Sequence, residues 1–339
     1  MNPVMNSTTH RSSVRKPETP HARTFSARTM AGVSLVEVMV TLAIGMVVTL
    51  GIVGIMGLNQ QNLRITESLS ESQENARMAF ELIARDVRQA RDTSCGPLAV
   101  TNTSFDDSDQ WWGEWWPIRG FAGDEETDAV AIGDGEDERV DGTQALQIQG
   151  SGETRIIKAI TGSKLELQTA ADTLNNGPII VCNLQTASLH VADVSGSEEN
   201  AITTDPLVTV SSSDDPQFHV SRLTAVTWYI GNNDRANEGG RSLYRIRLQA
   251  DGSTVTEEIL PGVVDMSLRY HARDAADFTN SVANQAAWND INAIELTLTT
   301  ESTQRNVTSD AAADSSYVGS DGRMRRQLTH VIALRNNAN

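Results

Sequence analysis

The sequence predicts an α+β protein in which one long N-terminal helix precedes a mainly antiparallel β-sheet. Residues 33–92 contain no proline and carry apolar side chains at helical spacing, whereas short segments with strand-like alternation follow Cys95. The chain is 39% hydrophobic and 21% charged, which is typical of a folded protein. We therefore expect a helix that leads into a folded head built around a sheet.

The apolar segment 33–58 decides how the N-terminal part is interpreted. Its 26 residues contain a single charged side chain, Glu37. About 20 apolar residues span a bilayer as a helix, so this segment is long enough to cross a membrane. It is longer than the apolar core of a cleavable secretory signal, and no small-residue cleavage site follows it. Taken alone, the segment predicts a single-pass membrane helix.

Charge is distributed unevenly along the chain. Residues 1–32 hold five of the 27 basic residues and one of the 44 acidic residues, and the whole chain has a formal net charge of −17. By the positive-inside rule, the basic N-terminus stays in the cytoplasm and the acidic remainder lies outside. An acidic body repels phosphate backbones, so we expect no nucleic-acid partner.

The helical pattern continues beyond residue 58. Charged side chains in segment 59–92 fall mostly on other faces than the apolar ones, so this segment is expected to be an amphipathic helix that continues into the head. One helix from Val33 to about Arg91 has a length of roughly 90 Å at 1.5 Å per residue. The apolar positions on its single face are Leu69, Ala76, Phe80, Ile83 and Val87.

Strands are expected in two parts of the head. Segment 93–222 is a connecting or inserted region with short strands, and segment 223–339 forms the antiparallel sheet. The glycine-rich polar stretch 231–241 is typical of a hairpin loop. The candidate strands are 145–148, 179–181, 223–230, 243–248, 263–270, 291–299 and 328–334.

Glu37 is unusual because it lies inside the apolar segment. A carboxylate at the centre of a membrane helix costs roughly 2.5–3.5 kcal/mol on insertion scales, so it needs a partner or a function. Because Glu37 lies near the cytoplasmic end, its side chain can also simply reach the interface. The acid alone does not decide between these two alternatives.

The residues around this acid resemble the processing site of type IV prepilins. The motif runs from Met30 through Gly32 and Val33 to Glu37, and the long apolar helix follows it directly. The resemblance implies that a prepilin peptidase cleaves between Gly32 and Val33, removes 1–32 as a cytoplasmic leader and methylates the new N-terminus at Val33. Glu37 then becomes the fifth residue of the mature chain. The family usually has phenylalanine where this chain has Val33.

Segments in the head are similar to PilW-type minor pilins. They are the helix end 75–91 with Cys95 and Gly96, and the stretches 243–245, 262–270 and 331–336. The resemblance implies the pilin fold and a minor pilin, not an enzyme, that helps to initiate or prime assembly of a type IV pilus. It also implies that a chain with Glu37 is incorporated below the pilus tip.

The same resemblance implies partners and a location. The partners are other minor pilins, the major pilin, the prepilin peptidase and the inner-membrane assembly platform, with no cofactor. The chain first crosses the inner membrane once, with a periplasmic head, and then enters the cell-surface pilus. Two alternatives are a minor pseudopilin of a type II secretion system and a pilus-associated adhesin.

The chain has two cysteines, Cys95 and Cys182. In an exported protein an oxidised pair is the default expectation, and two free buried thiols are the alternative. A bridge closes a loop of 88 residues, counting both cysteines, which contributes about 4–5 kcal/mol in the chain-entropy model.

Four of the six tryptophans lie close together in the sequence. They form either an exposed contact patch for a neighbouring subunit or surface ligand, or a hydrophobic clamp at the helix–sheet connection. Packing is the favoured interpretation, because large exposed aromatic clusters are rare on single domains. The four residues are Trp111, Trp112, Trp115 and Trp116.

No catalytic or metal-binding pattern is present in the sequence. The acidic segment 124–141 lacks the glycine and glutamate that a calcium-binding EF-hand loop requires, because Arg139 and Ala145 occupy those positions. The six histidines have no metal-ligand spacing to one another, and no nucleophile or phosphate-binding motif occurs. We therefore expect a solvated acidic loop, no metal and no enzymatic activity.

Overall fold

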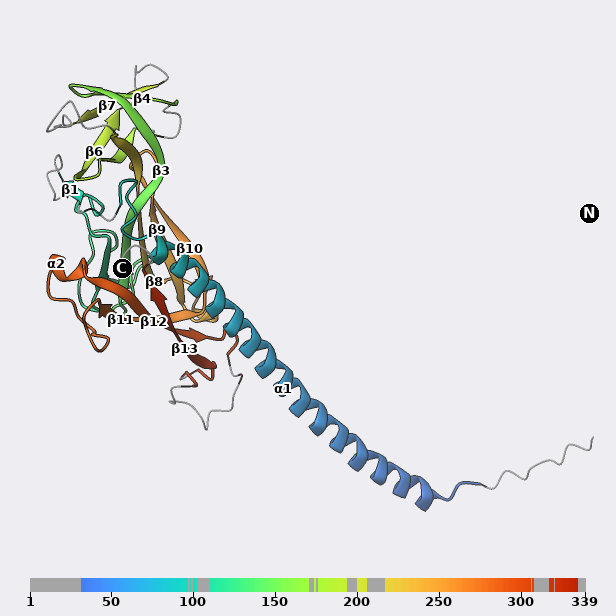
Figure 1. Cartoon of the computed structure of the whole chain (residues 1–339). Helices are drawn as coiled ribbons and strands as arrows, with labels where there is room; N and C mark the ends of the chain where they lie inside the picture. Colours follow the sequence, from blue (N-terminus) through green and yellow to red (C-terminus); the bar gives the residue numbers. More distant parts are fainter. Residues whose placement is uncertain are drawn as a thin grey trace, which may run out of the picture. The chain divides into compact units, whose positions relative to one another are not determined.

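The structure is a computed structural model with the α+β fold that the sequence predicts (Figure 1). It divides into two compact units, residues 1–56 and 57–339, which are described separately. Most of the expected leader 1–32 lies outside the described residues. The structure describes residues 32–96, 98, 100–102, 110–170, 174, 176–193, 200–205, 217–305, 307, 317–319 and 321–334.

Helix α1 (Leu35–Gln89) agrees with the predicted helix to within two residues at each end. It begins where the Ser34 carbonyl accepts a hydrogen bond from the Val38 amide at 3.2 Å. It ends just before Arg91, which has a left-handed conformation with φ of 63°. The Arg91 amide then donates to the carbonyl of Gln149 at 3.0 Å, which ties the end of the helix to the sheet.

The larger sheet has an open part and a part that closes on itself. Its outer strands follow the order β10-β9-β8 at one end and β4-β3-β2 at the other. Strand β1 (Val100–Asn102) adds to β6 in parallel, while the other pairings are antiparallel. The further strands are β2 (Ile118–Phe121), β3 (Ala145–Thr161), β4 (Lys164–Leu167), β5 (Gly177–Cys182), β6 (Ala187–Asp193), β7 (Ala201–Asp205), β8 (His219–Asn232), β9 (Arg241–Leu248) and β10 (Thr254–Pro261).

Part of this sheet closes on itself. The described strands pair in the cycle β3-β4-β7-β6-β5-β8, and β8 pairs back to β3. Figure 1 shows β4, β6 and β7 gathered at the end of the long strand β3. We call this ring the small barrel. Each of its strands contributes to one apolar interior, which removes exposed sheet edges. The interior contains Ile157, Leu165, Leu167, Leu174, Ile179, Val181, Ala192, Ile202 and Val220.

A second, three-stranded antiparallel sheet has the order β11-β12-β13, with β11 (Val263–Ala272), β12 (Ile291–Glu301) and β13 (Arg325–Ala333). Gly262 joins it to β10 with φ of 75°, and a Cβ at this position would lie 2.6 Å from the carbonyl oxygen of Glu301. Only glycine fits such a turn without strain. A short helix, α2 (Gln285–Trp288), lies between β11 and β12, and a 3-10 turn, η1 (Ala236–Glu238), lies between β8 and β9.

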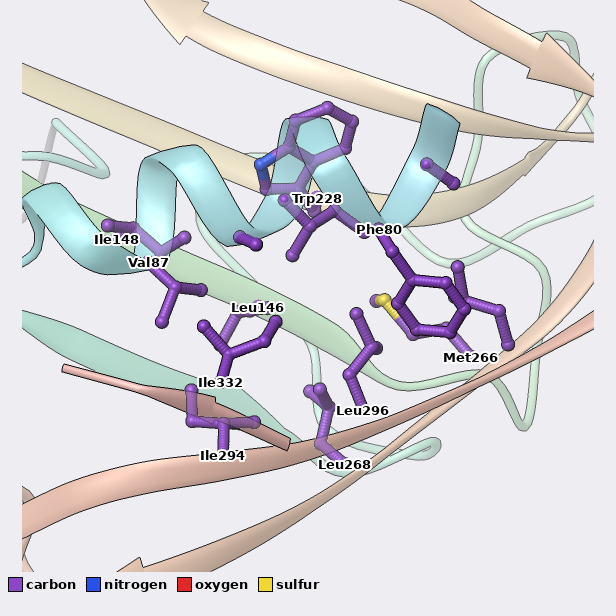
Figure 2. Packing of buried hydrophobic residues seen from close by; sticks show 14 of the residues in the cluster. Phe80, Val87, Leu146, Ile148, Trp228, Met266, Leu268, Ile294, Leu296 and Ile332 are labelled. Carbon is purple, nitrogen blue, oxygen red and sulfur yellow. The ribbon is translucent and has the colours of Figure 1, made fainter. Parts of the chain in front are cut away.

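The main core surrounds the second half of α1. Figure 2 shows Phe80 and Val87 of the helix among side chains from both sheets. The larger sheet contributes Leu146, Ile148 and Trp228, and the three-stranded sheet contributes Met266, Leu268, Ile294, Leu296 and Ile332. The helix is therefore part of the core of the unit 57–339.

Strand β8 is buried on both faces. Trp228 and Ile230 face the helix core, whereas Leu223, Ala225 and Tyr229 belong to clusters on the opposite face. Residues 110–140 cover much of that opposite face, while Ile118 and Val140 of the same segment belong to the helix core. Within this covering segment, Arg139 is fully buried and donates hydrogen bonds to the carbonyls of Ala122, Gly123 and Glu125.

Six of the seven candidate strands lie within strands of the structure, namely β3, β5, β8, β9, β11 and β12, and the seventh, 328–334, extends one residue beyond the end of β13. Stretch 231–241 connects the antiparallel strands β8 and β9, as the hairpin prediction requires. Strands β1, β2 and β10 and the small-barrel strands β4, β6 and β7 were not among the candidates. Segment 93–222 therefore contains more β-strands than its sequence indicates.

One half-buried carboxylate links the helix to the larger sheet. The indole N–H of Trp228 donates to Oδ2 of Asp86 at 2.9 Å. Burial raises the pKa of Asp86, although the hydrogen bond from Trp228 and the nearby Arg245 act in the opposite direction. Because the folded-state pKa lies above the ordinary value, the native state binds more protons than the unfolded state. Stability from this group is therefore lost as pH rises through the raised pKa.

We predict that Asp86→Asn keeps the acceptor for Trp228 and removes the cost of ionisation. The variant should match the wild type near pH 3 and become more stable than it as pH rises towards 7. Chemical unfolding of the detergent-solubilised chain at several pH values measures this difference. Glu74→Gln, at an exposed position of the same helix, is the control. A loss of stability at neutral pH in Asp86→Asn would contradict the prediction.

Candidate assembly segment

The predicted processing site lies immediately before α1. Gly32, Val33 and Ser34 precede the helix, and Glu37 is in its first turn. The Val33 side chain is 68% exposed. The bond between Gly32 and Val33 is therefore not covered by other described parts of the chain.

The apolar residues of the first unit have no protein cover. Every residue from 32 to 56 is exposed in this unit. Among the described residues, α1 is the one helix long and apolar enough to cross a membrane, with a mean hydropathy of 2.5 over its most apolar 18 residues and none of them buried. A surface this apolar needs lipid or other protein chains around it.

Glu37 has no side-chain partner among the described residues. Its backbone carbonyl accepts a hydrogen bond from Thr41 Oγ1 at 2.9 Å, but no hydrogen bond or ion pair involves its carboxylate. Ser34 and Glu37 have the spacing of a capping box, yet neither of its two side-chain hydrogen bonds is formed. Within the described part of the chain, the carboxylate therefore remains unpaired.

Burial of α1 begins at Ser68, within the second unit. Ser72 and Thr300 share a hydrogen bond of 2.5 Å, and the rings of Phe80 and His330 lie 4.6 Å apart. Gly150 allows the end of the helix to approach β3, because a Cβ there would lie 2.6 Å from the carbonyl oxygen of Gln89. These contacts fix the second half of α1 against both sheets.

The two cysteines are joined in the structure. Cys95, just after α1, forms a disulfide with Cys182 at the end of β5, with their Cα atoms 6.0 Å apart. The bridge connects the end of the helix to the small barrel. Ser94 and His219 lie beside it, with His219 Nδ1 3.7 Å from Cys95 Sγ.

The four clustered tryptophans do not form one exposed patch. Trp112 and Trp115 are 5% and 6% exposed, and they pack against β5, β6 and β8 on the face of the sheet opposite α1. Trp111 and Trp116 are half-buried. The cluster lies beside the disulfide and packs against the sheet and against Cys95 and Leu98, which belong to the connection between α1 and β1. This is the packing role that we favoured.

The acidic segment 124–141 is organised by its own backbone. The Glu138 carboxylate accepts a hydrogen bond from the Gly135 amide at 2.8 Å, and Asp137 has a left-handed conformation with φ of 63°. Within the described part of the chain, no group of three or more His, Cys, Asp or Glu side chains is arranged to hold a metal ion.

Comparison with known families gives one match. Residues 227–336 match the family model of the type IV pilus-assembly protein W. No curated protein and no solved structure matches the chain. The match covers about the last third of the chain, and it indicates a role in type IV pilus assembly.

The matched residues have a defined place in the fold. They include the end of β8 and the whole of β9, β10, β11, β12 and β13, which supply much of the core around α1. The matched family is named for a protein of type IV pilus assembly. Together with the apolar helix, the match indicates that the chain associates with a membrane.

Sequence reasoning missed several residues that position these elements. Asp86 was not singled out, because its partner Trp228 is 142 residues away. Tyr270 and Trp288 pack edge-to-face with ring centroids 4.7 Å apart. A lone tryptophan within the polar stretch 273–290 was the available signal, since such a side chain usually finds an apolar partner.

We predict that the unfolded, non-reduced chain contains no reactive thiol. A thiol assay in denaturant measures this, and two thiols per chain would contradict the disulfide. Reduction should lower the free energy of unfolding by about 4–5 kcal/mol, because the bridge spans a sequence separation of 87. Cys95→Ser with Cys182→Ser should lose a similar amount, which separates loss of the bridge from effects of the reductant.

Proposed function

We propose that this chain is a minor pilin that helps to initiate and prime a type IV pilus and is incorporated below its tip. One observation carries the proposal. An uncovered apolar helix starts directly after Gly32 and Val33 and holds a single, unpartnered carboxylate at Glu37, while its second half is built into the core of a head. The match of residues 227–336 supports the same machine.

Processing creates the group that Glu37 needs. Cleavage between Gly32 and Val33 leaves a positively charged amine at Val33, which the peptidase then methylates. The Val33 amine of an entering subunit pairs with Glu37 of a subunit already in the filament. Each charge offsets the desolvation cost of the other, whereas an unpaired buried charge costs several kcal/mol. The pair therefore favours one axial register between neighbouring subunits.

The proposed route begins at the inner membrane. The basic leader keeps the N-terminus in the cytoplasm, where the prepilin peptidase acts, and the acidic head is exported to the periplasm. The assembly platform then transfers the chain from lipid into the filament. There the exposed apolar residues of α1 exchange lipid for the helices of other minor pilins and the major pilin.

Gene deletion distinguishes this function from the two alternatives. Loss of piliation supports the assembly role, and loss of protein secretion with normal pili supports a type II pseudopilin. Normal pili with lost attachment support an adhesin. The matched family is named for type IV pilus assembly, which favours the first outcome.

We predict that the mature protein begins at a methylated Val33. Intact-mass measurement and N-terminal sequencing of the membrane form test this directly. Gly32→Ala or a larger residue at this position should leave the leader attached, because the peptidase recognises the glycine. A mature form that retains Met1 would overturn the proposal.

We predict that Glu37→Ala is cleaved and inserted into the membrane but enters filaments at least about tenfold less than the wild type, because one buried charge loses its partner. Quantitative immunoblotting of sheared pili and membranes measures incorporation. Glu67→Ala, at an exposed position farther along α1, should incorporate normally. Equal incorporation of Glu37→Ala and the wild type would exclude the proposed pairing.

A further inference from the structure

A cavity of about 250 Å³ lies beside β2 in the unit 57–339. Its wall combines residues from β2, the end of β11, the connection 280–284 and α2, so it is formed by segments far apart in the sequence. All of its lining residues belong to the described part of the chain. The assembly function proposed above uses none of them.

The cavity has aromatic walls. Trp116, Phe121, Tyr270 and Trp288 all line it. Tyr270 and Trp288 are 3% and 6% exposed and pack edge-to-face at 4.7 Å, so their rings are held in place by the core beneath. The parts of these rings that line the cavity are held rigid, so a ligand can contact them at a small entropic cost.

Arg119 adds a fixed, planar polar group. Its guanidinium carbon lies 4.7 Å from the ring centroid of Trp116 and 4.5 Å from that of Phe121. It also pairs with Glu125 at 3.1 Å. This ion pair leaves no net charge between the two residues, which disfavours a strongly charged ligand.

Several hydrogen-bonding groups of the lining are unused. Trp116 Nε1 is buried without a hydrogen-bond partner among the described residues, and the Tyr270 hydroxyl also has none. Asn284 and Gln144 each use the side-chain oxygen to accept a backbone amide, which leaves both NH₂ groups free. Burial raises the pKa of Tyr270, so its hydroxyl stays neutral and can both donate and accept.

Gly120 completes the shape of the wall. A Cβ at this position would lie 1.5 Å from the hydroxyl oxygen of Tyr270. Only glycine lets the tyrosine hydroxyl lie directly against the backbone of β2. The close contact with Gly120 of β2 therefore fixes the position of the Tyr270 hydroxyl in the wall of the cavity.

We propose that this cavity binds a neutral sugar. A pyranose ring has apolar C–H faces that pack on aromatic rings, and its hydroxyls both donate and accept hydrogen bonds at the edges. The lining offers the same combination of rigid aromatic surface, neutral amides, a tyrosine hydroxyl and a charge-balanced Arg119–Glu125 pair. The volume lies just below the range of about 300–1,000 Å³ for drug-sized ligands, which fits one sugar ring.

The test measures binding of single sugars to the full chain. The probes are D-glucose, D-galactose, D-mannose and N-acetyl-D-glucosamine, with N-acetylneuraminic acid and inorganic phosphate as charged comparisons. The chain is solubilised in a detergent without a sugar headgroup, because maltosides and glucosides compete. Saturation-transfer NMR detects binding, and titration gives its affinity.

Two variants place a tryptophan in the cavity, and a matched control places the same side chain outside it. Ala283 lines it and is exposed, so Ala283→Trp blocks it without removing core packing, and Asn280→Trp does the same from a second position. Ala276→Trp introduces the same side chain at an exposed site in the same connection, outside the lining. Thermal unfolding of all three variants identifies any that fail to fold.

We expect at least one neutral sugar to bind the wild type and Ala276→Trp equally, and to bind the blocked variants at least about tenfold more weakly. The inference is overturned if none of the neutral sugars binds, if blocking leaves their affinity unchanged, or if only the charged compounds bind. Incorporation into pili is measured separately. Failure of sugar binding therefore leaves the assembly function untouched.

Discussion

Burial of one face of α1 is the interaction on which the rest of the unit 57–339 depends. Phe80, Ile83 and Val87 are almost completely buried between two sheets. Burying each such side chain stabilises the fold by about 1.5–3 kcal/mol, so this face dominates the core. The same helix continues into a first unit with no apolar face covered by the protein. The second half of α1 is therefore covered by the head of its own chain, whereas the first half needs lipid or other protein chains around it.

Strand β8 connects the packing around α1 to the other parts of the head. Its alternating side chains face the helix core on one side and the tryptophan segment on the other. Along its edges it pairs with β3 on one side, and with β5 and then β9 on the other, so it belongs both to the open sheet and to the small barrel. The Cys95–Cys182 bridge connects the end of α1 to the small barrel. Losing it should therefore loosen the small barrel relative to the end of α1.

Local patterns predicted the helix and seven strands, because apolar periodicity is a property of neighbouring residues. They did not predict β10, whose alternating positions are mostly polar at the edge of a sheet, or the closure of the small barrel. Closure depends on β8 pairing with both β3 and β5 across long sequence separations. For the same reason the sequence left the role of the tryptophans open. Glu37 and the Gly32–Val33 bond were accessible to sequence reasoning because their chemistry is contained in one short segment.

The residues matched by the family model include most of the strands that cover α1, with β3 as the exception, whereas the small barrel strands β4, β5, β6 and β7 and the segment 110–140 lie outside the match. Strands that cover α1 must keep apolar side chains at fixed register positions, and this requirement limits their sequence. The strands β4, β5, β6 and β7 pack into a separate apolar interior and contribute no residue to the core around α1. Their surface can therefore change without disturbing the packing of α1. The sugar-sized cavity lies where the two kinds of element meet, because β2 and Trp116 come from outside the match and Tyr270 and Trp288 from within it.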